Sequence, residues 1–201
     1  MYRLYDYLPS GNGYKGRLLL TLLGLPFERV ELDIDRAETR TAAYLAKNPN
    51  GRIPALELEN GEVLAESNAI LFYLADGTPY LPDDRWLRAQ VLQWMFFEQY
   101  SHEPYVAVAR YFLQHLEMTE ARRVLLAEKQ DKGRAALAVM EDHLAPRTYF
   151  VGERTTIADL ALYAYTHVAD EGGYDLEPYP AVRAWLARAA AEPGHIPITQ
   201  G

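Results

Sequence analysis

Glu66 and Ser67 are the polar pair whose position suggests chemistry most directly. They precede the apolar residues 70–74, which are typical of a helix, and Ser67 is of a type that caps helices. A helix N-terminus carries unsatisfied N–H groups and the positive end of the helix dipole, so it attracts carboxylates and other anions. The pair is therefore either part of a carboxylate site or an ordinary cap that follows an acidic residue.

A second polar segment, residues 9–13, has the sequence PSGNG. It separates an expected strand at residues 2–8 from an expected helix at residues 14–23, so Ser10 and Asn12 also lie near a helix start. Lys15 follows in the first helical turn, where a cation is unusual because it opposes the helix dipole. Lys15 either serves the same site or only faces water.

The chain contains no cysteine. This absence excludes disulfides, thiolate metal sites and catalysis through a protein thiol. The histidines show no metal-ligand spacing such as H-x-x-x-H, so we expect no catalytic metal; they are His102, His115, His143, His167 and His195.

The formal net charge of -8 argues against nucleic acid as a partner, because nucleic-acid affinity depends mainly on neutralising phosphates. Hydrophobic residues make up 49% of the chain, which is enough for a buried core. No apolar run approaches the ~20 residues of a membrane-spanning helix, and the first residues lack a secretion signal. We expect a cytoplasmic protein without a membrane partner.

The first part of the chain alternates strands and helices. Strands are expected at residues 2–8, 27–33, 54–58 and 62–65, with helices at 14–23 and 41–47 and a third that Ser67 caps. Asn60 and Gly61 predict a hairpin between the last two strands. This order predicts one mixed sheet of four strands covered by helices, the α/β part of the fold.

The second part of the chain has only helical patterns. They cover residues 85–101, 104–116, 119–143, 159–169 and 180–191. Two prolines and a glycine between residues 76 and 84 indicate a linker. We therefore expect an α/β domain at residues 1–76, a linker at 77–84 and an all-α helical bundle at 85–201.

Three motifs in order resemble the glutathione S-transferase superfamily. They are residues 48–56 (NPNGRIPAL), residues 64–70 (LAESNAI) and residues 155–159 (TTIAD). The first two resemble the glutathione-binding signature, and the third resembles the capping box of the C-terminal domain, which we interpret as a fold marker. The resemblance covers nearly the whole chain and implies a thioredoxin-like N-terminal domain followed by a helical domain.

The resemblance also implies glutathione-binding residues. Ile53 would offer its backbone to the tripeptide beside a cis Pro54, Ser67 would receive the γ-glutamyl carboxylate, and Glu66 would pair with the ammonium group. Thr39 and Arg40 lie in the loop where the family places a polar residue near the glycyl carboxylate. Arg40 or Arg52 would supply local positive charge, although either arginine is equally compatible with a solvated surface position.

The sulfur of glutathione requires a donor that stabilises its thiolate. Residues 10–15 resemble the Thr-Pro-Asn-Gly-x-Lys stretch of bacterial nu-class transferases, which assigns the catalytic role to Ser10 and Asn12. A free thiol has a pKa of about 8.5, and one charge-assisted hydrogen bond could lower it by ~1–2. Tyr5 and Tyr7 lie on one face of the first strand and are rival donors, and both are also compatible with simple packing.

We therefore expect a homodimeric transferase that conjugates glutathione, its co-substrate, to a small hydrophobic electrophile. A nu-class-like disulfide reductase and a non-catalytic protein-interaction module are the alternatives, since fold alone does not determine function. The second substrate would lie near the first long helices, where part of the polar segment 98–103 would face it; the aromatic candidates are Tyr100, His102, Tyr105 and Tyr111.

Overall fold

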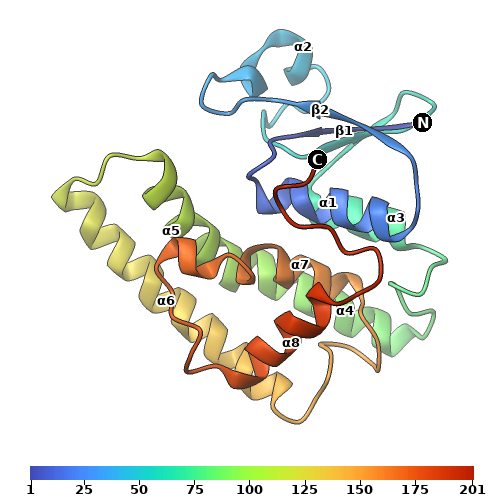
Figure 1. The fold of residues 1–201 in the computed structure, drawn as a ribbon. Helices are drawn as coiled ribbons and strands as arrows, with labels where there is room; N and C mark the ends of the chain where they lie inside the picture. Colours follow the sequence, from blue (N-terminus) through green and yellow to red (C-terminus); the bar gives the residue numbers. More distant parts are fainter. The chain divides into compact units, whose positions relative to one another are not determined.

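The chain forms two compact units (Figure 1). The computed structural model describes residues 1–201, and its internal contacts group residues 1–77 with 192–201 and separate them from residues 78–191. This division differs from the expected helical domain at residues 85–201, because the C-terminal segment returns to the first unit. Ile196 and Ile198 are buried there.

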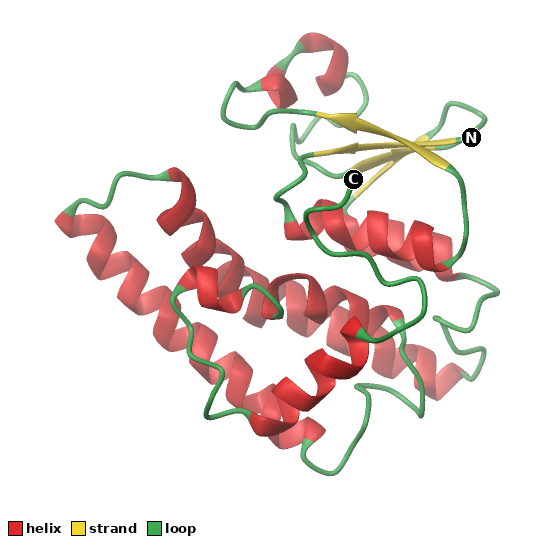
Figure 2. Cartoon of the chain, in the orientation of Figure 1, coloured by secondary structure: helices red, strands yellow, loops and turns green.

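The first unit contains the expected mixed sheet of four strands. The strands are β1 (Tyr2–Asp6), β2 (Phe27–Glu31), β3 (Ala55–Glu57) and β4 (Val63–Ala65), in the spatial order β2-β1-β3-β4. β1 and β2 are parallel, whereas β3 is antiparallel to both β1 and β4. Figure 2 shows that strands occur only in this unit.

Helices α1 (Gly11–Leu22) and α3 (Ser67–Ala75) pack together on one side of this sheet, and α2 (Ala42–Leu45) lies beyond the other side (Figure 1). Leucines 18–20 of α1 are all buried. The helix ends where Gly24 adopts φ 65, a conformation that glycine tolerates best, and Leu25 N donates to Leu20 O at 2.9 Å. The predicted stop signal is therefore confirmed.

The second unit is helical, as predicted. Its helices are α4 (Arg85–Phe97), α5 (Glu103–His115), α6 (Glu120–Leu144), α7 (Ile157–Thr166) and α8 (Pro180–Ala190), with a 3-10 turn η3 (Ala169–Gly172) after α7. A π-helical segment, η2 (Glu98–His102), joins α4 to α5. None of the helices combines the length and the apolar character that crossing a membrane requires.

Helix α7 is buried along its whole length, and its N-terminus contains the predicted capping box. Asp159 accepts hydrogen bonds from the backbone N and the hydroxyl of Thr156, both at 2.9 Å. It also accepts from Phe150 N at 3.1 Å and from Trp185 Nε1 at 3.0 Å. Burial raises the pKa of this carboxyl, and the hydrogen bonds oppose that increase.

Candidate functional site

The sheet register brings three of the candidate segments to one edge of the first unit. Tyr5 of β1 is paired with Ala55 of β3, and Ala55 is paired with Ala65 of β4. Beyond this edge β1 continues towards α1, β4 continues into α3, and Pro54 immediately precedes β3. The N-termini of α1 and α3 therefore lie near the Ile53–Pro54 bond.

A chain of hydrogen bonds connects the two helix N-termini. Lys15 Nζ donates to Ser67 Oγ at 3.3 Å and to Asn68 Oδ1 at 3.3 Å. Ser67 Oγ donates to Asn12 Oδ1 at 3.2 Å. Lys15 and Asn12 belong to α1, whereas Ser67 and Asn68 belong to α3, so this polar network joins two segments that are far apart in the sequence.

Lys15 is fully buried, so the interpretation that it only faces water is wrong. A buried ammonium is costly unless polar groups compensate it, and here a hydroxyl and an amide oxygen accept its hydrogen bonds. The sequence marked Lys15 only as a cation at an unfavourable place in a helix. Its acceptors come from α3, and no local sequence pattern reveals that contact.

Ser10 caps helix α1. Its Oγ accepts a hydrogen bond from Gly13 N at 3.3 Å, which satisfies one of the free N–H groups of the first turn. Because accepting a bond leaves the hydroxyl proton in place, Ser10 can still donate to a ligand. Asn12 lies two residues further along and is half-buried, with its oxygen directed towards Ser67.

Glu66, and not Ser67, occupies the N-cap position of α3. The expected cap at Ser67 is therefore wrong by one residue, and the Ser67 hydroxyl instead bonds across to Asn12. Glu66 has φ 68, which is an unusual conformation for a residue with a side chain and costs about 1–3 kcal/mol. The Glu66 side chain is exposed at the entrance to α3.

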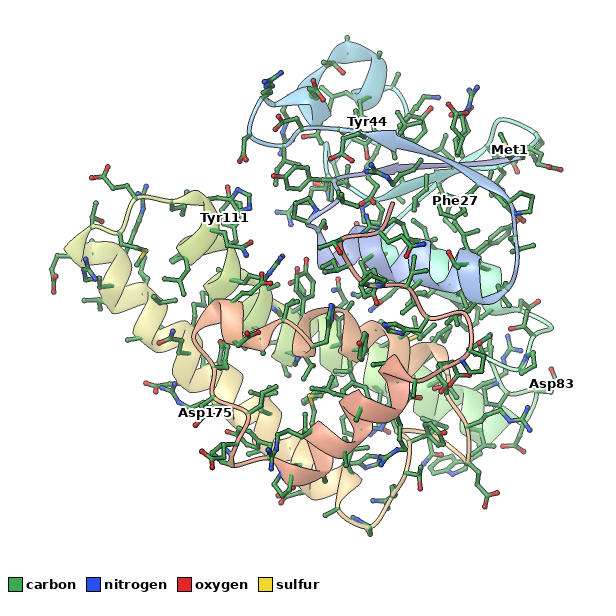
Figure 3. All side chains as sticks on the ribbon, in the orientation of Figure 1. Met1, Phe27, Tyr44, Asp83, Tyr111 and Asp175 are labelled. Carbon is green, nitrogen blue, oxygen red and sulfur yellow. The ribbon has the colours of Figure 1, made fainter.

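The Ile53–Pro54 bond is cis, as the resemblance implied. The backbone just before it is fixed by buried side chains: Arg52 O accepts from Tyr44 Oη at 2.6 Å and from Asn48 Nδ2 at 2.7 Å. Figure 3 labels Tyr44 on α2. Burial raises the pKa of Tyr44 to about 12, so this phenol stays protonated and keeps donating at neutral pH.

The two candidate arginines have different surroundings. Arg40 Nη1 donates to Asn50 O at 3.1 Å, and the guanidinium lies against Gly51, where a Cβ would be 2.5 Å from Nη1. Both Arg40 and Arg52 are exposed. The Arg40 side chain is therefore held on the loop that precedes Ile53, whereas for Arg52 it is the backbone carbonyl that is held, by Tyr44 and Asn48.

The rival tyrosines of β1 both have carboxylate partners. Tyr5 Oη donates to Glu57 Oε2 at 2.6 Å, and Glu57 also pairs with Lys47 at 2.7 Å. Burial and the bond to Glu57 raise the pKa of Tyr5. Tyr7 Oη lies 3.5 Å from Asp35 Oδ2. These contacts occupy the Tyr5 hydroxyl proton and place a carboxylate beside the Tyr7 hydroxyl.

A buried ion pair supports the turn that carries Ser10 and Asn12. Asp6 and Arg17 are completely buried and form a salt bridge, and Arg17 Nη2 also donates to Leu8 O at 2.9 Å. Burial raises the pKa of Asp6, and Arg17 opposes the increase. A Cβ at Gly13 would overlap Asp6 Oδ1, so this carboxylate requires glycine in the first turn of α1.

The polar segment expected to face a second substrate divides into buried and exposed residues. Glu98 and His102 are buried in η2, and His102 Nε2 lies 3.0 Å from Thr166 Oγ1. Tyr100 is 84% exposed and Tyr111 is 42% exposed. Glu98 and His102 therefore belong to the core of the helical unit, whereas Tyr100 and Tyr111 are exposed.

Comparison with known proteins identifies relatives of both units. Residues 1–76 match the family model for the N-terminal domain of glutathione S-transferase, and residues 93–193 match the model for its C-terminal domain. A crystal structure of a glutathione S-transferase from Pseudomonas fluorescens superposes with a TM-score of 0.97. That protein is 54% identical, with 99% of each chain covered.

Ure2p is a more distant relative. Its structure in complex with glutathione has a TM-score of 0.89 and 28% identity, covering 100% of this chain and 93% of that one. Another structure of Ure2p is described as the nitrogen regulation fragment of a yeast prion protein. Protein URE2 of Candida glabrata is 30% identical over the whole of this chain and 68% of its own length.

Proposed function

The chain belongs to the glutathione S-transferase family, and from this premise we propose that it binds glutathione, lowers the pKa of the thiol and conjugates the thiolate to a small hydrophobic electrophile. The observation that carries the proposal is the hydrogen-bonded network of Lys15, Ser67 and Asn12 between two helix N-termini. Such a place suits an anionic ligand, and glutathione carries two carboxylates and an ionisable thiol.

In this proposal the first unit holds the tripeptide. The backbone of Ile53 bonds to the cysteinyl part, Ser67 and the amides of α3 receive the γ-glutamyl carboxylate, and the exposed Glu66 pairs with the ammonium group. Arg40 is favoured over Arg52 for the glycyl carboxylate, because its side chain is already held by Asn50 O. The unusual backbone of Glu66 supports a binding role, since such strain is concentrated at functional sites.

The thiolate would be stabilised by Asn12 and Ser10 at the N-terminus of α1. A hydrogen bond to a charged group contributes roughly 1.5–3 kcal/mol, so one such bond lowers the thiol pKa by ~1–2. The thiol proton leaves to solvent. The sulfur lone pair then forms a bond to the electrophilic carbon, and the leaving group departs with the electrons of the bond that breaks.

Calorimetric titration with glutathione at pH 7, in two buffers of different ionisation enthalpy, tests binding and ionisation together. We expect binding with net release of protons, and affinity about 10-fold or more lower for Ser67→Ala, which loses a charge-assisted bond. Absence of binding at millimolar glutathione would contradict the proposal. Binding without proton release would contradict its catalytic part.

A regulatory role without conjugation is the second candidate, and the similarity to the nitrogen regulation fragment of Ure2p favours it. Conjugation of an activated aryl chloride distinguishes the two, because only the transferase consumes both reactants. The same assay with a mixed disulfide of glutathione tests the nu-class-like reductase. We also propose that the protein is cytoplasmic and forms a homodimer. A monomer found by light scattering at micromolar concentration would contradict the homodimer.

A further inference from the structure

Lys15 makes contacts that the binding roles above leave unexplained. It is fully buried, it lies just beyond the first turn of α1, and its Nζ is 3.3 Å from both Ser67 Oγ and Asn68 Oδ1. A cation at a helix N-terminus opposes the helix dipole and is costly to bury. Lys15 forms these contacts in spite of both penalties. This indicates that its ammonium group has a role towards Ser67 and Asn68.

The donor and the acceptor of each hydrogen bond in this network can be assigned. An ammonium group has three donors and no acceptor, so Ser67 Oγ must accept from Lys15. The hydroxyl proton of Ser67 is then directed to its other neighbour, Asn12, at 3.2 Å. Only the oxygen of the Asn12 amide can accept that proton.

The orientation of the Asn12 amide follows from these donors and acceptors. Because Oδ1 faces Ser67, the Nδ2 group on the other side of the amide carbon points away from Ser67. An Asn side chain rotated by half a turn would place two donors against the Ser67 hydroxyl, which could then accept from both Asn12 and Lys15. Lys15 disfavours that arrangement, because two donors would then share the Ser67 oxygen and the Ser67 hydroxyl proton would lose its acceptor on Asn12.

We propose that Lys15 is a positioning residue that orients the Asn12 amide through Ser67, so that Asn12 presents its N–H donors to the sulfur of glutathione. The inference rests on the proposed function, since it assumes that Asn12 is a thiolate donor. The same ammonium places a positive charge beneath the N-terminus of α3, where the γ-glutamyl carboxylate is expected. One buried residue thereby connects recognition of that carboxylate to activation of the thiol.

The first test is a double-mutant cycle read out as the pKa of the bound thiol. Lys15→Met keeps most of the length and volume of the side chain, one atom shorter, but removes the charge and the donors. We expect Lys15→Met and Asn12→Ala each to raise the thiol pKa by about 1–2. In Asn12→Ala the further change Lys15→Met should have no additional effect, because the group it orients is gone. Full additivity, or an unchanged thiol pKa in Lys15→Met, would overturn the inference.

Chemical rescue separates positioning from mere packing. The chain has no cysteine, so a Lys15→Cys variant carries a single thiol that can be alkylated in denaturant before refolding. Alkylation with 2-bromoethylamine rebuilds a lysine analogue, and 1-bromopropane gives a neutral chain of the same length. The aminoethyl form should restore the parent thiol pKa and the propyl form should not. Equal values in the two forms would show that the charge is irrelevant.

NMR of the unliganded protein tests the amide orientation without glutathione. In the parent we expect no nuclear Overhauser contact between the Asn12 side-chain amide protons and the Ser67 β-protons, and we expect this contact to appear in Lys15→Met. The same pattern in both proteins would overturn the role of Lys15. A parent protein that leaves the thiol pKa of bound glutathione unchanged would instead contradict the proposed function, while the NMR result still decides the orientation.

Discussion

Glu66 combines an exposed acidic side chain with a backbone conformation that favours glycine. Glu66→Gly should therefore relieve backbone strain and stabilise the fold by about 0.5–1 kcal/mol while it weakens glutathione binding about 10-fold, because the partner of the ammonium group is lost. Denaturant unfolding and calorimetry measure the two effects separately.

Ala37 provides a matched control for Glu66. It is also exposed and has φ 58, and it has no assigned role in binding. Ala37→Gly should give a similar gain in stability with unchanged affinity for glutathione. If Glu66→Gly also left the affinity unchanged, the proposed contact with the ammonium group would be wrong.

The buried phenol of Tyr44 donates a hydrogen bond to Arg52 O, in the backbone just before Ile53 and Pro54. Burial raises its pKa from 10.0 to about 12, so folding favours the protonated phenol. The contribution of the protonated Tyr44 phenol to the free energy of unfolding is fully present below pH 10 and is lost as the pH rises from 10 to 12. At pH 11 the loss is about 1 kcal/mol.

Tyr44→Phe tests this linkage. At pH 8 the variant should be about 1 kcal/mol less stable, because Arg52 O loses a donor. Between pH 8 and pH 11 it should lose less stability than the parent, by about 1 kcal/mol, when unfolding is measured with denaturant at both values. Parallel pH profiles for the two proteins would show that the Tyr44 pKa is unshifted.

The first turn of helix α1 is restricted by strand β1 beneath it. A Cβ on Gly13 would overlap Asp6 Oδ1, and Asp6 is held by Arg17 in the core. Gly13→Ala should therefore destabilise the protein by about 2 kcal/mol or more, in spite of the better helix propensity of alanine.

Gly16 is the control in the same helix. Its added Cβ would lie 3.2 Å from the flexible end of Leu4, so the contact is tight but can relax. Gly16→Ala should change the free energy of unfolding by less than about 1 kcal/mol, because helix propensity offsets the crowding. Equal effects of the two substitutions in thermal unfolding would contradict the role assigned to Asp6.

The elements that could be predicted are those with local signals. The Asn60–Gly61 hairpin, the stop at Gly24 and the capping box of α7 each depend on residues a few positions apart. The burial of Lys15 could not be predicted from helical periodicity. Residues 13–20 of α1 are all buried, so this helix lacks the alternating apolar and polar faces from which burial is inferred.

The part of the site that could be predicted came from family motifs at Ile53 and Glu66–Ser67, and the structure brings these segments to one sheet edge. The supports of the site, namely Tyr44, Asn48 and the Asp6–Arg17 pair, were missed. These residues act through contacts between segments that are distant in the sequence. Such contacts leave no local pattern in a single sequence. The same is true of His102, which was a candidate to face the second substrate although it is buried against Thr166.

The C-terminal segment, residues 192–201, completes the first unit. Tyr14 Oη donates to Ile196 O at 2.6 Å, and Arg17 Nη2 donates to Ile198 O at 2.8 Å. Both donors are buried residues of α1, the helix that carries Ser10 and Asn12. The end of the chain therefore supports the candidate site although it follows the helical unit in the sequence.

Removal of residues 192–201 should destabilise the first unit by several kcal/mol, because each buried donor left without a partner costs about 1–3 kcal/mol. Removal of the exposed residues 199–201 alone should change stability by less than about 0.5 kcal/mol. Thermal unfolding of the two truncated proteins and the parent makes the comparison. Similar unfolding of all three would show that the tail contributes nothing to α1.

The proposed activation of glutathione by this protein can be measured as the pKa of the bound thiol. This pKa is obtained from the ultraviolet absorbance of the thiolate against pH, for the parent protein, Ser10→Ala and Asn12→Ala. We predict a pKa below the value of about 8.5 for a free thiol in the parent, and a return towards that value in Asn12→Ala. Tight binding with an unshifted pKa in all three proteins would contradict the account, because glutathione would then be held without being activated.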